Sequence, residues 1–271
     1  MQPTTPYTLN IKGQLLTLNR PLVMGILNAT TESFYEASQA HTAESVAKRV
    51  HTIVNEGGDI IDIGACSTKP GLEPISEEEE MRRLEFTLPI VRATAPEAIL
   101  SVDTFRARVA EYCIKEHGVH IINDVSSGKI DKLMFDTIAD LNVPYVLTHN
   151  SEGTWKEIAC DLALRIESLR LMGVSDIIVD PGFGFGKTLN DNYHLMAHLE
   201  EMHQLGCPIL VGISRKSMIY KYLNSSPEEA LVGTTVLHAV ALTKGAHILR
   251  VHDVKAAMET IKIIEKLNSE H

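Results

Sequence analysis

The stretch best suited to chemistry is residues 176–188, which read DIIVDPGFGFGKT. The apolar run 177–179 predicts a buried parallel strand that ends on the carboxylate of Asp180. The loop after it carries three glycines, which let backbone approach a ligand, and two phenylalanines with flat apolar faces. A flexible loop with two packing rings is an equal alternative for this stretch alone. A phosphate-binding P-loop is rejected, because Pro181 stands where its first glycine belongs.

Polar residues also follow the other predicted strands. The side chains at these eight strand ends are Asn28, Asp62, Asp103, Asn123, His149, Asp180, Arg215 with Lys216, and Arg250 with His252. One or two of them could cap the following helices, since Asp and Asn often do so. Eight such positions in register instead favour an α/β enzyme whose strands deliver their side chains to one mouth.

This expected mouth divides by charge. Acids and amides follow strands two to six, and cations follow strands seven and eight, where barrels of this kind usually bind phosphate. A ligand with an anionic end and a nitrogen-rich end would match both halves. Asp180, Asp103 and Asn123 could pair with its amino and ring N–H groups. Ser217, at a helix start, could hold a carboxylate of a second substrate. The hypothesis requires Asp180 and Arg250 to face one cavity.

The elements that must position these residues are alternating apolar strands and amphipathic helices. The expected strands are 22–27, 59–63, 98–102, 119–122, 144–147, 177–180, 208–211 and 246–249. The expected helices are 43–56, 77–94, 106–117, 131–141, 155–172, 191–205, 218–223, 227–244 and 255–267. Ser76 and Glu79 predict a capping box for the second helix. The pattern predicts a single (β/α)8 TIM barrel, an α/β fold, over residues 21–271. A doubly wound sheet is the alternative, but no G-x-G-x-x-G turn follows strand one.

Residues 1–20 are expected to form an N-terminal extension. The segment 7–19 alternates apolar and polar residues around Lys12 and Gly13, which predicts a β-hairpin. With 271 residues and 44% hydrophobic content, the whole chain can bury a large core. Its net charge of -10 argues against nucleic acid as a partner.

The lack of a recognisable targeting signal and the cysteine usage suggest a cytoplasmic protein. The sequence has no run of about 18 apolar residues, and its start lacks the basic and apolar regions of a secretory signal, so we expect no membrane partner. The cysteines are predicted to be free thiols without metal-ligand spacing. They are Cys66, Cys113, Cys160 and Cys207.

Several motifs in order make the chain resemble the dihydropteroate synthases, a family of pterin-binding TIM barrels. These motifs are MGILNATTESF, GGDIIDIGACSTKPG, SVDT, IINDV, DPGFGFGKT, GISRKS and LRVHDV, within residues 24–255. The family condenses 6-hydroxymethyl-7,8-dihydropterin diphosphate with p-aminobenzoate, releasing pyrophosphate, in folate biosynthesis. The resemblance therefore implies a sulfonamide-targeted transferase with these two small-molecule substrates, Mg²⁺ as cofactor, and a homodimer.

The resemblance also implies a role for individual residues. Pterin would be bound by Asp103, Asn123, Asp180 and Lys216. The diphosphate would be bound by Asn28, Thr68, Arg250 and His252, and Asn28 would also hold Mg²⁺. The p-aminobenzoate would contact Thr68, Lys69, Pro70, Phe185, Ser217 and Phe34. The catalytic residues would be Asp103, Lys216 and Glu32. Loops one and two, which carry Glu32, Phe34 and Lys69, are expected to close over the second substrate and exclude water.

Three departures from the family pattern bear on the second substrate and on sulfonamide sensitivity. Ala29, Thr31 and Glu32 replace the Val, Pro and Asp of N-V-T-P-D-S-F. Lys69 replaces the Arg of S-T-R-P, exchanging a bidentate fork for a point charge. The strand-five loop lacks the arginine of H-M-R-G-x-P. The residues in or around that place are Thr148, Asn150, Ser151 and Glu152.

Other interpretations remain open at this stage. A pterin-dependent methyltransferase of the same barrel family would share the pterin acids but would not need the SRKS and RVH motifs. A non-catalytic pterin-binding protein would be consistent with the altered loops. Asp62 and Asp124 are slightly more consistent with anchoring of backbone N–H groups than with substrate contact. His149 fits a packed core residue and a ligand neighbour equally well.

Overall fold

Eight parallel strands lie at the centre of a computed structural model, which describes residues 6–29, 39–66 and 74–270. Their order in the sheet is β8, β7, β6, β5, β4, β3, β10, β9. The bounds are β3 Leu22–Asn28, β4 Ile60–Gly64, β5 Ile99–Asp103, β6 Ile121–Asp124, β7 Tyr145–Thr148, β8 Ile177–Asp180, β9 Leu210–Val211 and β10 Ile248–Val251. A parallel bridge between Val179 and Ile209 joins the two ends. The expected TIM barrel is confirmed, and the doubly wound sheet is wrong because its edge strands never meet.

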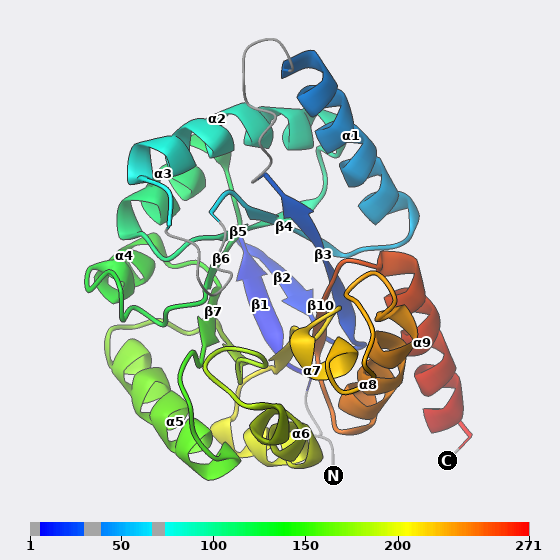
Figure 1. Ribbon diagram of the computed structural model, residues 1–271. Helices are drawn as coiled ribbons and strands as arrows, with labels where there is room; N and C mark the ends of the chain where they lie inside the picture. Colours follow the sequence, from blue (N-terminus) through cyan, green and yellow to red (C-terminus); the bar gives the residue numbers. More distant parts are fainter. Residues whose placement is uncertain (1–5, 30–38, 67–73, 271) are drawn as a thin grey trace.

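Helices surround this barrel (Figure 1). Their bounds are α1 Gln39–Asn55, α2 Glu77–Thr94, α3 Ala107–His117, α4 Met134–Leu141, α5 Trp155–Leu171, α6 Leu189–Ala197, α7 Ser217–Tyr220, α8 Leu231–Thr243 and α9 Val254–Asn268. The helix expected at 191–205 is in fact α6 followed by a 3-10 helix, η2 Leu199–Leu205, with the break at His198. The capping box is half formed: Ser76 Oγ accepts from Glu79 N at 3.2 Å, while the Glu79 carboxylate pairs with Arg82 and Arg83.

The predicted hairpin closes the amino-terminal end of the barrel. It consists of β1 Thr8–Ile11 and β2 Gln14–Thr17, which pair antiparallel and lie behind the barrel strands in Figure 1. Both turn residues, Lys12 and Gly13, have positive φ, as a type I′ turn requires. Leu9, from the hairpin, is 1% exposed and packs among the apolar residues inside the barrel. The hairpin therefore blocks access to the barrel interior from this end.

The barrel interior has an apolar layer and, nearer the mouth, a polar one. The apolar layer is formed by inward residues such as Ile60, Ile121, Val146, Ile178 and Ile248. Successive residues of a strand face opposite sides, so the residue two positions later also faces inward. We call these next residues the inner polar layer. Its members are Asp62, Ser101, Asn123, Thr148, Asp180 and Arg250.

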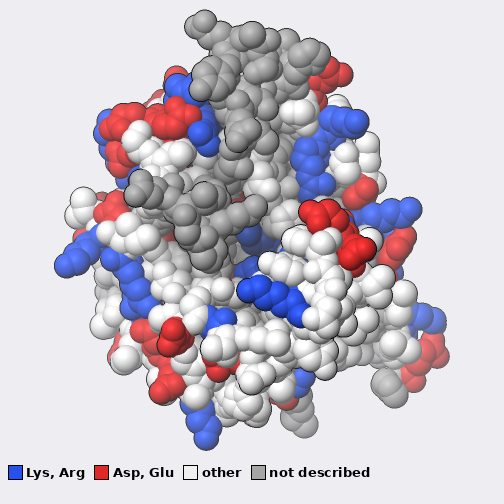
Figure 2. All heavy atoms as spheres, in the orientation of Figure 1, with Lys and Arg blue, Asp and Glu red and all other residues white. Residues whose placement is uncertain are grey.

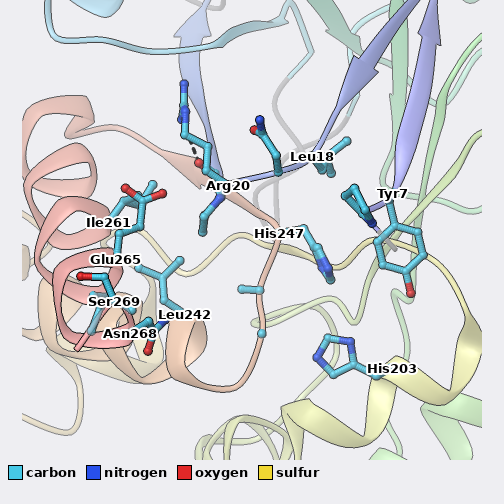
Figure 3. Close-up of a pocket in the computed structure, with 16 residues that line it drawn as sticks. Tyr7, Leu18, Arg20, His203, Leu242, His247, Ile261, Glu265, Asn268 and Ser269 are labelled. Carbon is cyan, nitrogen blue, oxygen red and sulfur yellow. Dashed lines mark hydrogen bonds between the residues drawn. The ribbon is translucent and has the colours of Figure 1, made fainter. Parts of the chain in front are cut away.

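A cavity of about 590 Å³ lies at the other end of the barrel (Figure 3). Tyr7, His203 and His247 line one side, while Ile261 and Glu265 of α9 line the opposite side. Its residues precede β3 and β10 or belong to the hairpin and helices, so the cavity is separate from the inner polar layer.

Two further predictions concern the whole described chain. None of the four cysteines forms a disulfide, and Cys160 alone among them is exposed. Within residues 6–29, 39–66 and 74–270, none of the helices combines the length and apolar character needed to cross a bilayer.

Candidate active site

The centre of the inner polar layer is an ion-pair bridge across the barrel. Arg250 Nε donates to Asp62 Oδ2 at 2.7 Å, and its Nη2 donates to Asp103 Oδ2, also at 2.7 Å. Asp62 is fully buried and Asp103 is nearly so, and charges buried to this degree persist only when they are paired. Arg250 therefore joins two acids from neighbouring strands β4 and β5 to β10.

Asp62 also fixes the side chains on either side of it. Its Oδ1 accepts from Ser101 Oγ at 2.6 Å, and its Oδ2 accepts from Asn123 Nδ2 at 3.1 Å. Because the Asn123 amide nitrogen is held by a carboxylate, the amide oxygen is left to serve as an acceptor. Among the described residues, the three partners of Asp62 are all side chains and not the expected backbone N–H groups.

Asp180 occupies the end of β8, where the glycine loop begins. Its Oδ1 accepts from Gly182 N at 2.8 Å. Gly182 has φ +76, and a Cβ there would lie 1.7 Å from His149 O, so no other residue fits without a backbone shift. The loop after β8 therefore passes close to the chain that follows β7, with no room for a side chain at Gly182. The equal alternative of a merely flexible loop is not supported at this glycine.

Lys216 reaches the same loop from the opposite side. Its Nζ donates to Phe183 O and lies 4.6 Å from the centre of the Phe185 ring. A Cβ at Gly184, which has φ +83, would come within 3.1 Å of Lys216 Cδ. The lysine stem therefore lies flat against the glycine loop, and its ammonium is held beside an aromatic face.

Asp180 and Arg250 lie close together at the same end of the barrel. A Cβ built on Gly212, which follows β9, would lie 3.8 Å from Asp180 Oδ2 and 3.9 Å from Arg250 Cβ. Gly212 therefore lies between the acid and the cation, and a side chain there would contact both. Figure 2 is drawn in the orientation of Figure 1 and shows Lys and Arg atoms near the middle of this face. The two residues therefore lie on the same side of the molecule, in agreement with the hypothesis.

Burial shifts the pKa values of Asp103, Asp180 and Lys216 in the direction that favours their neutral forms. It raises the pKa of Asp103 to about 7, although the Arg250 guanidinium opposes the shift. Burial also raises the pKa of Asp180, against the effect of Lys216. The same cause lowers the pKa of Lys216 to about 8, with Asp180 opposing. Neighbouring acids and bases whose pKa values are shifted in this way are typical of functional sites.

Of the cations expected at the mouth, Arg215 has a different role. Its Nε and Nη2 pair with Asp253 at 2.8 and 2.9 Å, and its Nη1 donates to the carbonyls of Pro227 and Glu228. We correct that expectation, because this guanidinium fastens the loop after β9 to the loop after β10. His252, by contrast, is exposed, and its Nδ1 lies 3.1 Å from Ser214 Oγ.

Two neighbouring polar residues stabilise the fold of the mouth. Asp124 accepts from Tyr145 Oη at 2.6 Å and from the backbone N–H groups of Ser126 and Gly128 at 2.7 Å each, so it is an anchor, as the sequence favoured. His149 is 3% exposed, lies 3.2 Å from Ser151 Oγ, and contacts Lys187. Burial lowers the pKa of His149 to about 4. It is a packed, hydrogen-bonded residue.

The remaining candidates lie at the rim or outside the described residues. Asn28 is exposed at the end of β3, and Ser217 is half-buried as the first residue of α7. Phe185 is half-buried in the glycine loop. Five candidates fall outside the described residues, and their roles stay predictions. They are Glu32, Phe34, Thr68, Lys69 and Pro70.

Sequence reasoning missed two residues that hold the site together. Ser101 binds Asp62, and its position two residues before Asp103 was the signal that it also faces inward. Lys187 was given no role from the sequence. Its Nζ in fact donates to the carbonyls of His149, Ser151, Gly182 and Phe185 at 2.9 to 3.3 Å. No sequence signal indicated this set of carbonyl contacts.

Comparisons with known proteins agree with this geometry. Residues 24–252 match the model of the family described as pterin binding enzyme. The curated dihydropteroate synthase of Escherichia coli (strain K12) is 37% identical over 270 residues, which cover 94% of each chain. The solved structure of Xanthomonas albilineans dihydropteroate synthase with 4-aminobenzoic acid has a TM-score of 0.88 at 35% identity, covering 98% of this chain and 99% of that one. The same enzyme in complex with 7,8-dihydropteroate has a TM-score of 0.86 at 34% identity, covering 97% and 99%. The chain therefore belongs to the dihydropteroate synthase family of pterin-binding enzymes.

Proposed function

We propose that this protein is a transferase that condenses 6-hydroxymethyl-7,8-dihydropterin diphosphate with p-aminobenzoate. The products are 7,8-dihydropteroate and pyrophosphate, in folate biosynthesis. The observation that carries the proposal is the inner polar layer, in which hydrogen-bond acceptors for a heterocycle lie beside Arg250 and Lys216 at one end of the barrel. The solved relatives bound to 4-aminobenzoic acid and to 7,8-dihydropteroate support it.

The pterin would lie between Asp180 and Asn123. The Asp180 carboxylate pairs well with two parallel N–H donors of a ring, and the Asn123 amide oxygen, left available by Asp62, offers a further acceptor. Lys216 would donate to a ring acceptor. Asp103, which shares Arg250 with Asp62, would face the ring from β5. These groups are held by the barrel strands, so little ordering is needed when the ligand binds.

Arg250 and His252 would receive the leaving group. The bond between the pterin methylene carbon and the diphosphate oxygen breaks, and its electron pair leaves with pyrophosphate. The p-aminobenzoate nitrogen then supplies the pair for the new C–N bond and loses a proton. A fixed guanidinium stabilises the charge that develops on the departing oxygens. The acids of the inner polar layer would stabilise the cationic methylene that forms between these two steps.

Mg²⁺ would be bound mainly by the diphosphate of the substrate and only to a small extent by protein side chains. The described residues contain no group of three His, Cys, Asp or Glu side chains that could hold a metal. Asn28, exposed at the rim, offers an amide oxygen, and Mg²⁺ commonly takes one or two protein ligands plus substrate phosphates and water. The ion would neutralise charge on the leaving diphosphate.

The second substrate would lie nearer the rim. Phe185 offers a ring face beside Lys216, and Ser217 begins α7, where a backbone N–H can meet a carboxylate. The resemblance assigns the remaining contacts to Thr68, Lys69, Pro70 and Phe34, and assigns catalysis in part to Glu32.

A homodimer in the cytoplasm completes the proposal. The outer face of α8 presents Val232 and Val236, which are 75% and 58% exposed. An apolar helix face of this kind supports a protein interface. Sedimentation of wild type and a Val232→Glu/Val236→Glu variant tests it: the wild type should sediment as a dimer, and the variant as a monomer.

The decisive experiment measures turnover. Purified protein with pterin diphosphate, p-aminobenzoate and Mg²⁺ should release pyrophosphate and form dihydropteroate, and omission of p-aminobenzoate should prevent dihydropteroate formation. Asp180→Asn should lose most activity, whereas Asp176→Asn, at the amino-terminal end of the same strand, serves as the matched control. Pterin binding without turnover would favour the non-catalytic alternative. Methyl transfer to a corrinoid protein would favour the methyltransferase.

A further inference from the structure

Thr148 is a buried residue of the inner polar layer that has no assigned role. It ends β7, and its side chain is fully buried. Val146, two residues earlier, packs inside the barrel, so the alternation of the strand places Thr148 inward as well. In the parallel pairing of β7 with β8, Thr148 lies opposite Asp180, and side chains opposite each other share a face.

The hydroxyl of Thr148 lacks a hydrogen-bond partner among the described residues. The backbone of Thr148 is engaged, since its carbonyl accepts from Ser127 Oγ. The neighbouring members of the layer are all partnered: Asp62 with Ser101 and Arg250, and Asp180 with Gly182 N. A buried hydroxyl without a partner costs free energy, which a bound ligand can recover.

We propose that the Thr148 hydroxyl is a pterin-binding group that forms a hydrogen bond with the heterocycle held by Asp180 and Asn123. The inference rests on the proposed function, because the heterocycle is that of the first substrate. A hydroxyl can donate and accept, so it complements Asp180 and the Asn123 oxygen, which only accept. Thr148 would therefore help to distinguish rings by the polar atom that they present next to β7.

The test compares three threonine substitutions. Thr148→Val keeps the shape and removes the hydroxyl, whereas Thr148→Ser keeps the hydroxyl. Thr87→Val is the matched control, because Thr87 on α2 is also fully buried with an unpartnered hydroxyl, but it is remote from the barrel interior. Calorimetric titration with 6-hydroxymethylpterin gives the dissociation constant of each, and thermal unfolding without ligand gives each melting temperature.

Opposite effects on binding and stability are expected. Thr148→Val should weaken pterin binding about tenfold, because the ligand atom loses its partner, while Thr148→Ser and Thr87→Val stay within about threefold of wild type. Without ligand, Thr148→Val should melt at the wild-type temperature or up to about 4 °C higher, since an unsatisfied buried group is removed.

Three results would overturn the inference. Wild-type affinity in Thr148→Val would show that the hydroxyl does not touch the ring. A clear fall in the melting temperature of the ligand-free variant would show that the hydroxyl has a structural partner. Equal losses of affinity in Thr148→Val and Thr87→Val would show a general packing effect. Failure of the wild type to bind pterin would instead refute the proposed function, so the two failures are distinguishable.

Discussion

The charge of Asp62 is predicted to set both the stability of the site and the protonation of Asp103. In the variant Asp62→Asn, the new amide side chain can keep all three hydrogen bonds. Its oxygen can take the place of Oδ2, which accepts from Arg250 and Asn123, and its nitrogen can donate to Ser101 Oγ. The substitution therefore removes a charge with little change of geometry.

The loss of stability in Asp62→Asn depends on which ion pair Arg250 retains. Loss of one partner of a buried ion pair costs about 3–5 kcal/mol when the other charge is left alone. Here Arg250 keeps Asp103 at 2.7 Å, so we expect a smaller cost, about 2 kcal/mol. For a chain of this size that corresponds to a melting temperature lowered by about 4–8 °C. Asp103 loses a repulsive neighbour, so its pKa should fall below about 7.

Thermal unfolding and the pH dependence of kcat/KM measure these two effects. Ser101→Ala is the matched control, because it removes one hydrogen bond to Asp62 and no charge. Asp62→Leu should be much worse than Asp62→Asn, since it leaves Arg250 Nε unpaired and frees the Asn123 amide to rotate. If Asp62→Asn unfolds at the wild-type temperature, and if the acid side of its pH profile of kcat/KM matches that of the wild type, the electrostatic reasoning is wrong.

Two further predictions follow from the mouth. The pH profile of kcat/KM should be bell-shaped: activity should rise as Asp103 loses its proton near pH 7 and fall as Lys216 loses its proton near pH 8, and a flat profile from pH 6 to 9 would contradict these roles. Gly182→Ala should lower the free energy of unfolding by about 3 kcal/mol, measured with urea, because its Cβ meets His149 O. The control Gly173→Ala has a similar positive φ but open space, so it should lose only about 1 kcal/mol, and equal losses would disprove the clash.

The architecture could be predicted because it depends on local patterns. Apolar runs, helical spacing and the Lys12–Gly13 turn act within a few residues, and each strand of the barrel formed where the pattern indicated. A helix cap differed where side chains competed for partners, although the helix itself has the predicted bounds. The Glu79 carboxylate bonds Arg82 and Arg83 on its own helix, which leaves the capping box incomplete.

The roles of individual site residues depend on distant partners and could be predicted only in part. Arg215 and Lys216 are adjacent cations in one motif, and nothing in their spacing separates them. The structure does, because Asp253, 38 residues away, takes Arg215, while Lys216 turns to the glycine loop. The role of Asp62 likewise depends on its ion pair with Arg250, which lies 188 residues later in the sequence.

Unused hydrogen-bonding capacity distinguishes residues that serve the fold from residues that await a ligand. Asp124 accepts three bonds from Tyr145, Ser126 and Gly128, and it has little left to offer. Asp180 ends the strand two places away in the sheet, yet its one hydrogen bond among the described residues goes to Oδ1, while Oδ2 lies beside Gly212. Both residues are buried acids at strand ends, so burial and residue type alone cannot rank them. Burying an acceptor that is only partly satisfied is costly, and a strand end that bears this cost is best explained by a ligand that removes it.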